Sequence, residues 1–206
     1  MKQYINLIRV VKLVFIVTCL YVVMNNLLSV KVYADSYDFA VLNVNASDKF
    51  VQSVQNELDN LPQEVKSYIT SNLKIFCYAN SLDWGHGGVE DGMTRTSNKG
   101  NIEIYLKEDC VDLHRTFLHE IGHALDKTHK IQTGISFSSE ELFQNCLNKN
   151  TGNFEKCLPY KAANMNTDSE RYAEIFTAYI MNPAALKKRC PLLYTYMDLY
   201  FKDLSS

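Results

Sequence analysis

The sequence predicts an α+β fold, with a small mixed sheet, flanking helices and a helical C-terminal part. Two segments, 73–79 and 101–106, have the apolar pattern of strands. Six longer segments have helical spacing, two of them before the strands and four after. This order is typical of α+β domains rather than of alternating α/β ones.

The elements before residue 110 follow from caps and apolar spacing. Ser47 and Asp48 cap an amphipathic helix over 47–60, and Pro62 begins a second helix that extends to about residue 72. Segment 73–79 is an apolar strand, and 101–106 alternates like a half-exposed one. Glycines are concentrated within 80–100, so that stretch is predicted to be a loop.

The second half of the chain is predicted to be helical. Segments 111–127, 138–148, 168–181 and 191–203 have helical spacing, and the last begins at Pro191. Helix 111–127 carries enough apolar residues to be packed in a core, and so does helix 168–181.

The N-terminus has the composition of a secretory signal peptide over residues 1–34. Three basic residues precede an apolar run over 13–23, and Val32-Tyr33-Ala34 suits cleavage after Ala34. The run is shorter than the roughly 20 residues that span a bilayer. We therefore expect a secreted, extracellular protein in which residues 35–206 form one domain. An uncleaved N-terminal anchor is the alternative.

The charge balance of the mature part argues against nucleic acid or an anionic membrane as partner. Four of the 21 lysines and arginines lie in residues 1–34, which leaves 17 against 23 acidic residues. Five cysteines remain after Ala34, and Cys146 with Cys157 is the expected pair if a disulfide forms. Five reduced thiols are the alternative.

The motif His119-Glu120-Ile121-Gly122-His123 predicts a metal centre on helix 111–127. Residues four apart share one helical face, so both imidazoles can reach one Zn²⁺ at about 2.0–2.1 Å. Glu120 is adjacent to His119 in the sequence, and its side chain is expected to point away from the metal ligands. This position suits a general base that takes the proton of the attacking water. The missing side chain of Gly122 allows another element to approach the helix closely.

Glu170 and Glu174 are the candidates for completing this centre. They lie one helical turn apart on a largely apolar helix, where two carboxylates need a partner. One can bind zinc and the other can accept the free ring N–H of a ligand histidine. Two surface glutamates beside Arg171 are the alternative.

Three motifs in this order resemble a known family. His119 to Asp126, Glu170 to Phe176 and Cys190 to Tyr194 resemble the catalytic domain of anthrax lethal factor, and more closely the secreted Pro-Pro endopeptidases. The resemblance covers about residues 73–200. It implies a zincin-like fold, a zinc metallopeptidase domain and one Zn²⁺ per chain.

The resemblance also implies roles for single residues. Glu170 would be the third zinc ligand, Glu174 would support the site, and Asp126 would orient the helix or a ligand. The family's oxyanion-stabilising Tyr falls on Ala163, so Tyr160 is the substitute candidate, with a surface tyrosine as the alternative.

Substrate binding is expected at an edge strand and an aromatic residue. In this family the strand before the metal helix pairs with extended substrate, which places Ile102 and Ile104 at the substrate. Trp84 would lie near the cleft, with a core anchor as the alternative.

The sequence therefore predicts a monomeric, secreted zinc metalloendopeptidase that hydrolyses extended extracellular proteins or peptides. Pro-Pro bonds are the bond class that the resemblance implies. No membrane contact is expected after signal cleavage. A toxin component that cleaves a host protein and a non-catalytic surface-binding protein with the same fold are the alternatives.

Overall fold

The structure is a computed structural model that describes residues 32–34, 39–69, 71–79, 82–83, 89–150, 154–158, 160 and 165–202. Segment 1–31 of the predicted signal peptide, Trp84 and Ala163 lie outside these residues. Within them, no helix is both long and apolar enough to span a membrane.

The predicted mixed sheet is confirmed, with five strands in the order β1-β2-β3-β7-β6. Strands β2, β3 and β7 are parallel, whereas β1 and β6 run antiparallel to their neighbours. A separate two-stranded ladder pairs β4 with β5. The strand bounds are β1 Val32–Ala34, β2 Ala40–Val44, β3 Lys74–Tyr78, β4 Leu82–Asp83, β5 Val89–Glu90, β6 Gly92–Thr96 and β7 Ile102–Lys107.

One face of the sheet forms the core with helices α2 (Asp48–Asp59) and α4 (Leu113–Thr133). Val41, Ile75 and Ile104 are in register across β2, β3 and β7, and none is exposed. On the other face Phe76 stacks on Tyr105, with 4.7 Å between ring centroids. This sidedness follows from the strand period of two.

The first two helices begin as the sequence predicts. The Ser47 side chain accepts a hydrogen bond from the Phe50 N–H and caps α2. Helix α3 (Gln63–Tyr68) follows Pro62 and ends about four residues earlier than expected.

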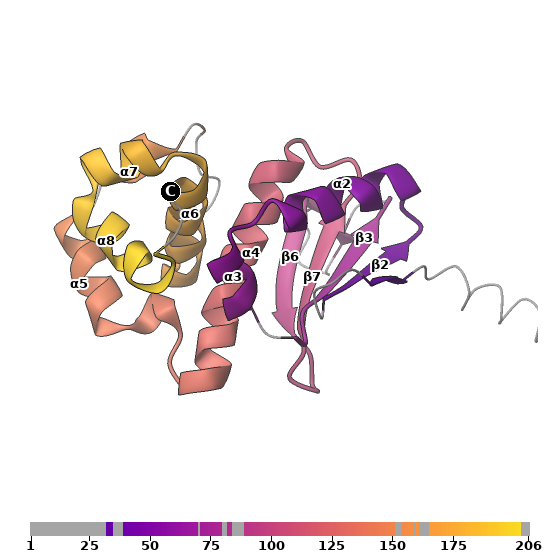
Figure 1. Ribbon diagram of the computed structural model, residues 1–206, viewed down its shortest axis with the longest axis horizontal. Coiled ribbons are helices and arrows are strands. Elements are labelled where there is room, and N and C mark those ends of the chain that lie inside the picture. The colour runs from indigo at the N-terminus through magenta and orange to yellow at the C-terminus, as the bar shows by residue number, and fades with distance from the viewer. Residues whose placement is uncertain are drawn as a thin grey trace, which may run out of the picture.

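Helix α4 lies between the sheet and the C-terminal helices (Figure 1). Asp112 caps its start by accepting from the Arg115 N–H. It continues to Thr133, six residues beyond the predicted end, and terminates at Gly134, whose φ of 88° is left-handed. The helix carrying the HExxH motif therefore contacts both layers of the fold.

The helical C-terminal part is confirmed and packs against α4 chiefly through α6 (Figure 1). Its α7 was not predicted, although Asn182 caps it and Pro183 occupies its first turn. The elements are η1 Phe137–Ser139, α5 Glu141–Lys149, η2 Phe154–Cys157, α6 Asp168–Met181, α7 Pro183–Arg189 and α8 Pro191–Tyr200.

The structure corrects the predicted edge strand. Strand β7 lies between β3 and β6, and its Ile102 and Ile104 are fully buried in the core. The prediction that these residues pair with substrate was therefore wrong. Among the described strands the edge beside α4 is β6, which lies in the stretch 80–100 that was predicted to be a loop.

The expected disulfide between Cys146 and Cys157 is not formed in the structure, which holds the described cysteines as thiols. The Cys157 thiol instead hydrogen-bonds Cys190 and lies 3.6 Å from the main-chain oxygen of Ala185.

Candidate metal centre

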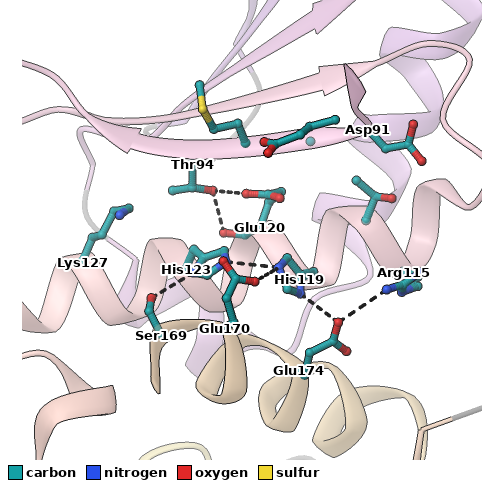
Figure 2. Close-up of a pocket in the computed structure, with 14 residues that line it drawn as sticks. Asp91, Thr94, Arg115, His119, Glu120, His123, Lys127, Ser169, Glu170 and Glu174 are labelled. Atoms are coloured by element: carbon teal, nitrogen blue, oxygen red, sulfur yellow. Dashed lines mark hydrogen bonds and ion pairs between the residues drawn. The ribbon is translucent and has the colours of Figure 1, made fainter. Parts of the chain in front are cut away.

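Helices α4 and α6 bring two imidazoles and one carboxylate together. The Nε2 atoms of His119 and His123 lie 3.1 Å apart. Glu170 on α6 places Oε2 3.2 Å from Nε2 of His119 and Oε1 3.4 Å from Nε2 of His123. Figure 2 shows both rings and the Glu170 carboxylate converging between the two helices.

Small residues make this convergence possible. A Cβ atom added at Gly122 would lie 2.8 Å from Cα of Ala173, which is closer than real side chains approach. Thr167 caps α6 by accepting from the Glu170 N–H at 3.2 Å, so Glu170 stands in the first turn, facing α4. The close approach anticipated at Gly122 is therefore made by α6.

These three residues fit a metal ion. Their potential ligand atoms all lie within 4.8 Å of one another. Burial lowers the pKa of His119, but Glu170 and Glu174 outweigh it and raise that pKa to about 10. Hydrogen bonds from His119 and His123 hold the pKa of Glu170 well below its usual range. The carboxylates around the two imidazoles therefore stabilise a positive charge at this place. Two imidazoles and one carboxylate are also a ligand set found at catalytic Zn²⁺ sites.

Glu120 points away from these ligands, towards strand β6 (Figure 2). The Thr94 hydroxyl lies 2.6 Å from Oε2 of Glu120 and 3.0 Å from its main-chain oxygen. Burial raises the pKa of Glu120, and the neighbouring His119 and His123 oppose that rise. Gly92 leaves room for this arrangement, because a Cβ atom there would lie 2.9 Å from Cγ of Glu120.

Behind His119 lies a buried carboxylate with three partners. Oε1 of Glu174 is 3.4 Å from Nδ1 of His119 and equally far from the Arg115 guanidinium. The Tyr160 hydroxyl donates to Oε2 of Glu174 at 2.7 Å, and the Arg115 guanidinium lies 3.9 Å from the centre of the Tyr160 ring. Burial raises the pKa of Glu174, but contacts with His119 and Tyr160 bring it below its ordinary value.

The Tyr160 side chain packs against Glu174 and Arg115. Its hydroxyl is engaged with Glu174, and burial with this carboxylate raises its pKa well above the ordinary value. Tyr160 is not among the described residues that line the cavity beside Glu120. In this arrangement Tyr160 contacts a residue that supports His119, and its predicted part in oxyanion stabilisation stays a prediction.

Behind His123 lies a second chain of contacts. Nδ1 of His123 is 3.1 Å from Oγ of Ser169, and that oxygen is 3.2 Å from Oδ2 of Asp126. Asp126 also accepts from the main chain and the hydroxyl of Ser138, at 2.7 and 2.9 Å. The predicted Asp126 thus reaches a ligand histidine, through a serine that no sequence signal marked.

A cavity of about 510 Å³ opens between β6, α4 and α6. It has both acidic and basic lining residues, several of which carried no motif in the sequence. Of the described histidines outside the centre, His114 pairs with Glu57 and His129 with Glu140. The cavity is lined by Glu90, Asp91, Gly92, Met93, Thr94, Arg115, Thr116, His119, Glu120, His123, Lys127, Ser169, Glu170 and Glu174.

Comparison with known proteins supports the fold. No family model and no curated protein sequence matches the chain. Among solved structures, the chain is similar to the Pro-Pro endopeptidase from Paenibacillus alvei, with a TM-score of 0.57 and 18% sequence identity. The likeness covers 78% of this chain and 97% of that one. The resemblance inferred from the motifs is therefore confirmed at the level of the fold.

Proposed function

We propose that this chain is a secreted zinc metalloendopeptidase with a zincin-like fold. The observation that carries the proposal is the convergence of His119, His123 and Glu170 at a cavity that Glu120 also lines. Three protein ligands leave the fourth position of a tetrahedral zinc site open, as hydrolytic sites require. The similarity to a solved endopeptidase supports the same reaction class.

His119 and His123 would hold the ion through Nε2, and Glu170 would hold it through its carboxylate. When bound, Zn²⁺ lowers the pKa of a water molecule and polarises the scissile carbonyl. Glu120 would accept the proton of the attacking water and pass it to the leaving nitrogen. Thr94 holds the Glu120 carboxylate in place through the 2.6 Å hydrogen bond.

Strand β6 provides the edge for an extended substrate. At the two ends of β6, the main-chain oxygen of Asp91 accepts from Lys107 at 3.0 Å and the main-chain N–H of Ser97 donates to Asn101 at 2.8 Å. The odd-numbered positions on this side of the ladder therefore bond to β7. Because antiparallel ladders alternate, the residues at even positions of β6 direct their main-chain groups outwards. These residues are Gly92, Thr94 and Thr96. A peptide can add there as a further strand.

The bond cleaved is proposed to be Pro-Pro in an extracellular protein or peptide. The motif resemblance and the specificity named for the similar solved structure both support this bond class. Cleavage after Ala34 would remove strand β1 and release a monomeric domain, residues 35–206, that acts outside the cell. Trp84 is proposed to contact the substrate.

Digestion of a peptide library by the purified, zinc-loaded protein tests this function. We expect cleavage at one preferred bond class, with Pro-Pro peptides enriched, and no cleavage by Glu120→Gln. A library that the wild-type protein binds but does not cleave would refute the enzyme and favour a binding protein with this fold. Cleavage elsewhere would refute only the Pro-Pro specificity.

A further inference from the structure

An imidazole binds a metal through one nitrogen, so the hydrogen must be on the other nitrogen. For His123 the metal-facing atom is Nε2, which lies 3.4 Å from Oε1 of Glu170. Its hydrogen must therefore be on Nδ1, and whatever accepts from Nδ1 selects the tautomer and the ring orientation. The atom next to Nδ1 is Oγ of Ser169, at 3.1 Å.

The direction of each hydrogen bond follows from a count of hydrogens. Asp126 is 4% exposed and receives the main-chain N–H and the hydroxyl of Ser138. An ionised carboxylate only accepts, so the Ser169 hydroxyl, 3.2 Å away, donates to Asp126. This uses the one hydrogen of Ser169. A lone pair of its oxygen is then left for His123, and Nδ1 of His123 is the donor.

The Ser169 hydroxyl is not needed to begin helix α6. A serine in the first turn of a helix often caps free main-chain N–H groups. Here Thr167 is the cap and already accepts from the Glu170 N–H. The side chain of Ser169 is therefore committed to the contacts across to α4.

We propose that Ser169 is a positioning residue that connects Asp126 to His123 and fixes the ring of this ligand for zinc. The two ligand histidines are thus supported differently. Glu174 lies directly beside His119, whereas Asp126, on the same helix as His123, acts through a hydroxyl from α6. The inference deepens the proposed function and rests on it for the identity of the ion.

Zinc affinity tests the positioning role. The dissociation constant is measured by competition with a chromophoric chelator for wild type, Ser169→Ala, Ser169→Thr and the control Ser53→Ala. Ser53 is a half-buried serine of α2 whose hydroxyl donates to the main-chain oxygen of Lys49. Loss of an outer hydrogen-bond partner typically weakens metal binding about 10–100-fold, which we expect for Ser169→Ala. Ser169→Thr keeps the hydroxyl and should stay within about threefold of wild type. An Ser169→Ala affinity within twofold of wild type overturns the proposal.

A double-mutant cycle tests whether Asp126 acts through Ser169. If it does, Asp126→Asn combined with Ser169→Ala weakens zinc binding no more than the stronger single substitution. Full additivity of the two losses would show that Asp126 acts by another route, and would overturn the connection.

Ring ¹⁵N chemical shifts of His123 in the metal-free protein provide a second readout. We expect the hydrogen on Nδ1 in wild type and Ser169→Thr, and a mixture of tautomers in Ser169→Ala. A wild-type ring with no hydrogen on Nδ1 overturns the proposal. A wild-type protein that binds no zinc but shows the Nδ1 hydrogen would remove the proposed function and leave the positioning role supported.

Discussion

Gly122 on α4 lies directly against Ala173 on α6, with no space for a side chain at the glycine. A Cβ atom there would stand 2.8 Å from Cα of Ala173 and 3.2 Å from its main-chain oxygen. Glu170 is one helical turn before Ala173 on α6. The spacing of the two helices therefore sets the distance between Glu170 and the two histidines.

Gly122→Ala should destabilise the fold and weaken zinc binding. Alanine improves helix propensity by about 1 kcal/mol, but overpacking typically costs about 1–3 kcal/mol. We expect a net loss of up to about 2 kcal/mol in the free energy of unfolding, measured in urea. Adding Ala173→Gly should not restore stability, because the closest contact is to Cα. A Gly122→Ala protein more stable than wild type would contradict this packing.

Glu120→Gln should abolish hydrolysis without removing the metal. The substitution keeps the size of the side chain but removes its ability to take a proton. General-base catalysis contributes about 10²–10⁴-fold, so the rate should fall by at least that factor. Zinc content, measured by elemental analysis, should remain near one per chain. Full activity in this variant would exclude the mechanism.

Thr94→Val should lower kcat while leaving KM close to wild type. Valine has the shape of threonine but cannot hydrogen-bond the Glu120 carboxylate. A hydrogen bond to a charged group contributes about 1.5–3 kcal/mol, so we expect a decrease of roughly 10–150-fold in kcat. Thr94→Ser keeps the hydroxyl and serves as the control. Equal kcat values in both variants would show that the contact does not position Glu120.

Tyr160→Phe separates two roles of this tyrosine. Its hydroxyl contacts Glu174, so its removal should weaken zinc binding by roughly tenfold and reduce hydrolysis only in proportion to zinc occupancy. If Tyr160 instead stabilised the oxyanion, kcat would fall about 10²–10³-fold at saturating zinc. Measuring kcat at several zinc concentrations distinguishes the two outcomes.

Removing the metal should lower both activity and thermal stability. Zinc at about 100 times its dissociation constant stabilises the folded state by about 2.7 kcal/mol, equivalent to a Tm shift of roughly 5–10 °C in a protein of this size. Thermal scans with chelator and after zinc readdition measure it. Glu170→Ala lacks one ligand and should show a much smaller shift at the same zinc concentration. An unchanged wild-type Tm would argue against a metal at this centre.

The helices with strong local signals were predicted well from the sequence. Helix α6 matches the prediction at both ends, and α2 begins at its predicted Ser47 cap. Strand β6 was missed because the glycines of 80–100, Gly92 among them, indicate a loop, whereas its pairing with β7 decides its conformation. Helix α7 is short, and its N-cap residue Asn182 is held by a hydrogen bond to the main-chain oxygen of Cys157, which is distant in the sequence.

The part of the metal centre that could be predicted is the part whose geometry follows from residue spacing along one helix. His119 and His123 follow from a four-residue interval. The need to explain two carboxylates on an apolar helix left Glu170 and Glu174 both open, and only the family resemblance selected Glu170. Thr94 and Ser169 could not be predicted in this way. Their roles depend on which residues β6 and α6 bring to α4, and hydroxyl residues occur widely on surfaces.

The contact between α4 and α6 also determines when the protein can become active. The histidines are synthesised well before Glu170, and their third partner arrives only after η1, α5 and η2 have been made. A chain in which α6 has not yet been synthesised and docked on α4 therefore has an incomplete ligand set. Under the proposed function, hydrolysis is expected only after α6 has docked on α4.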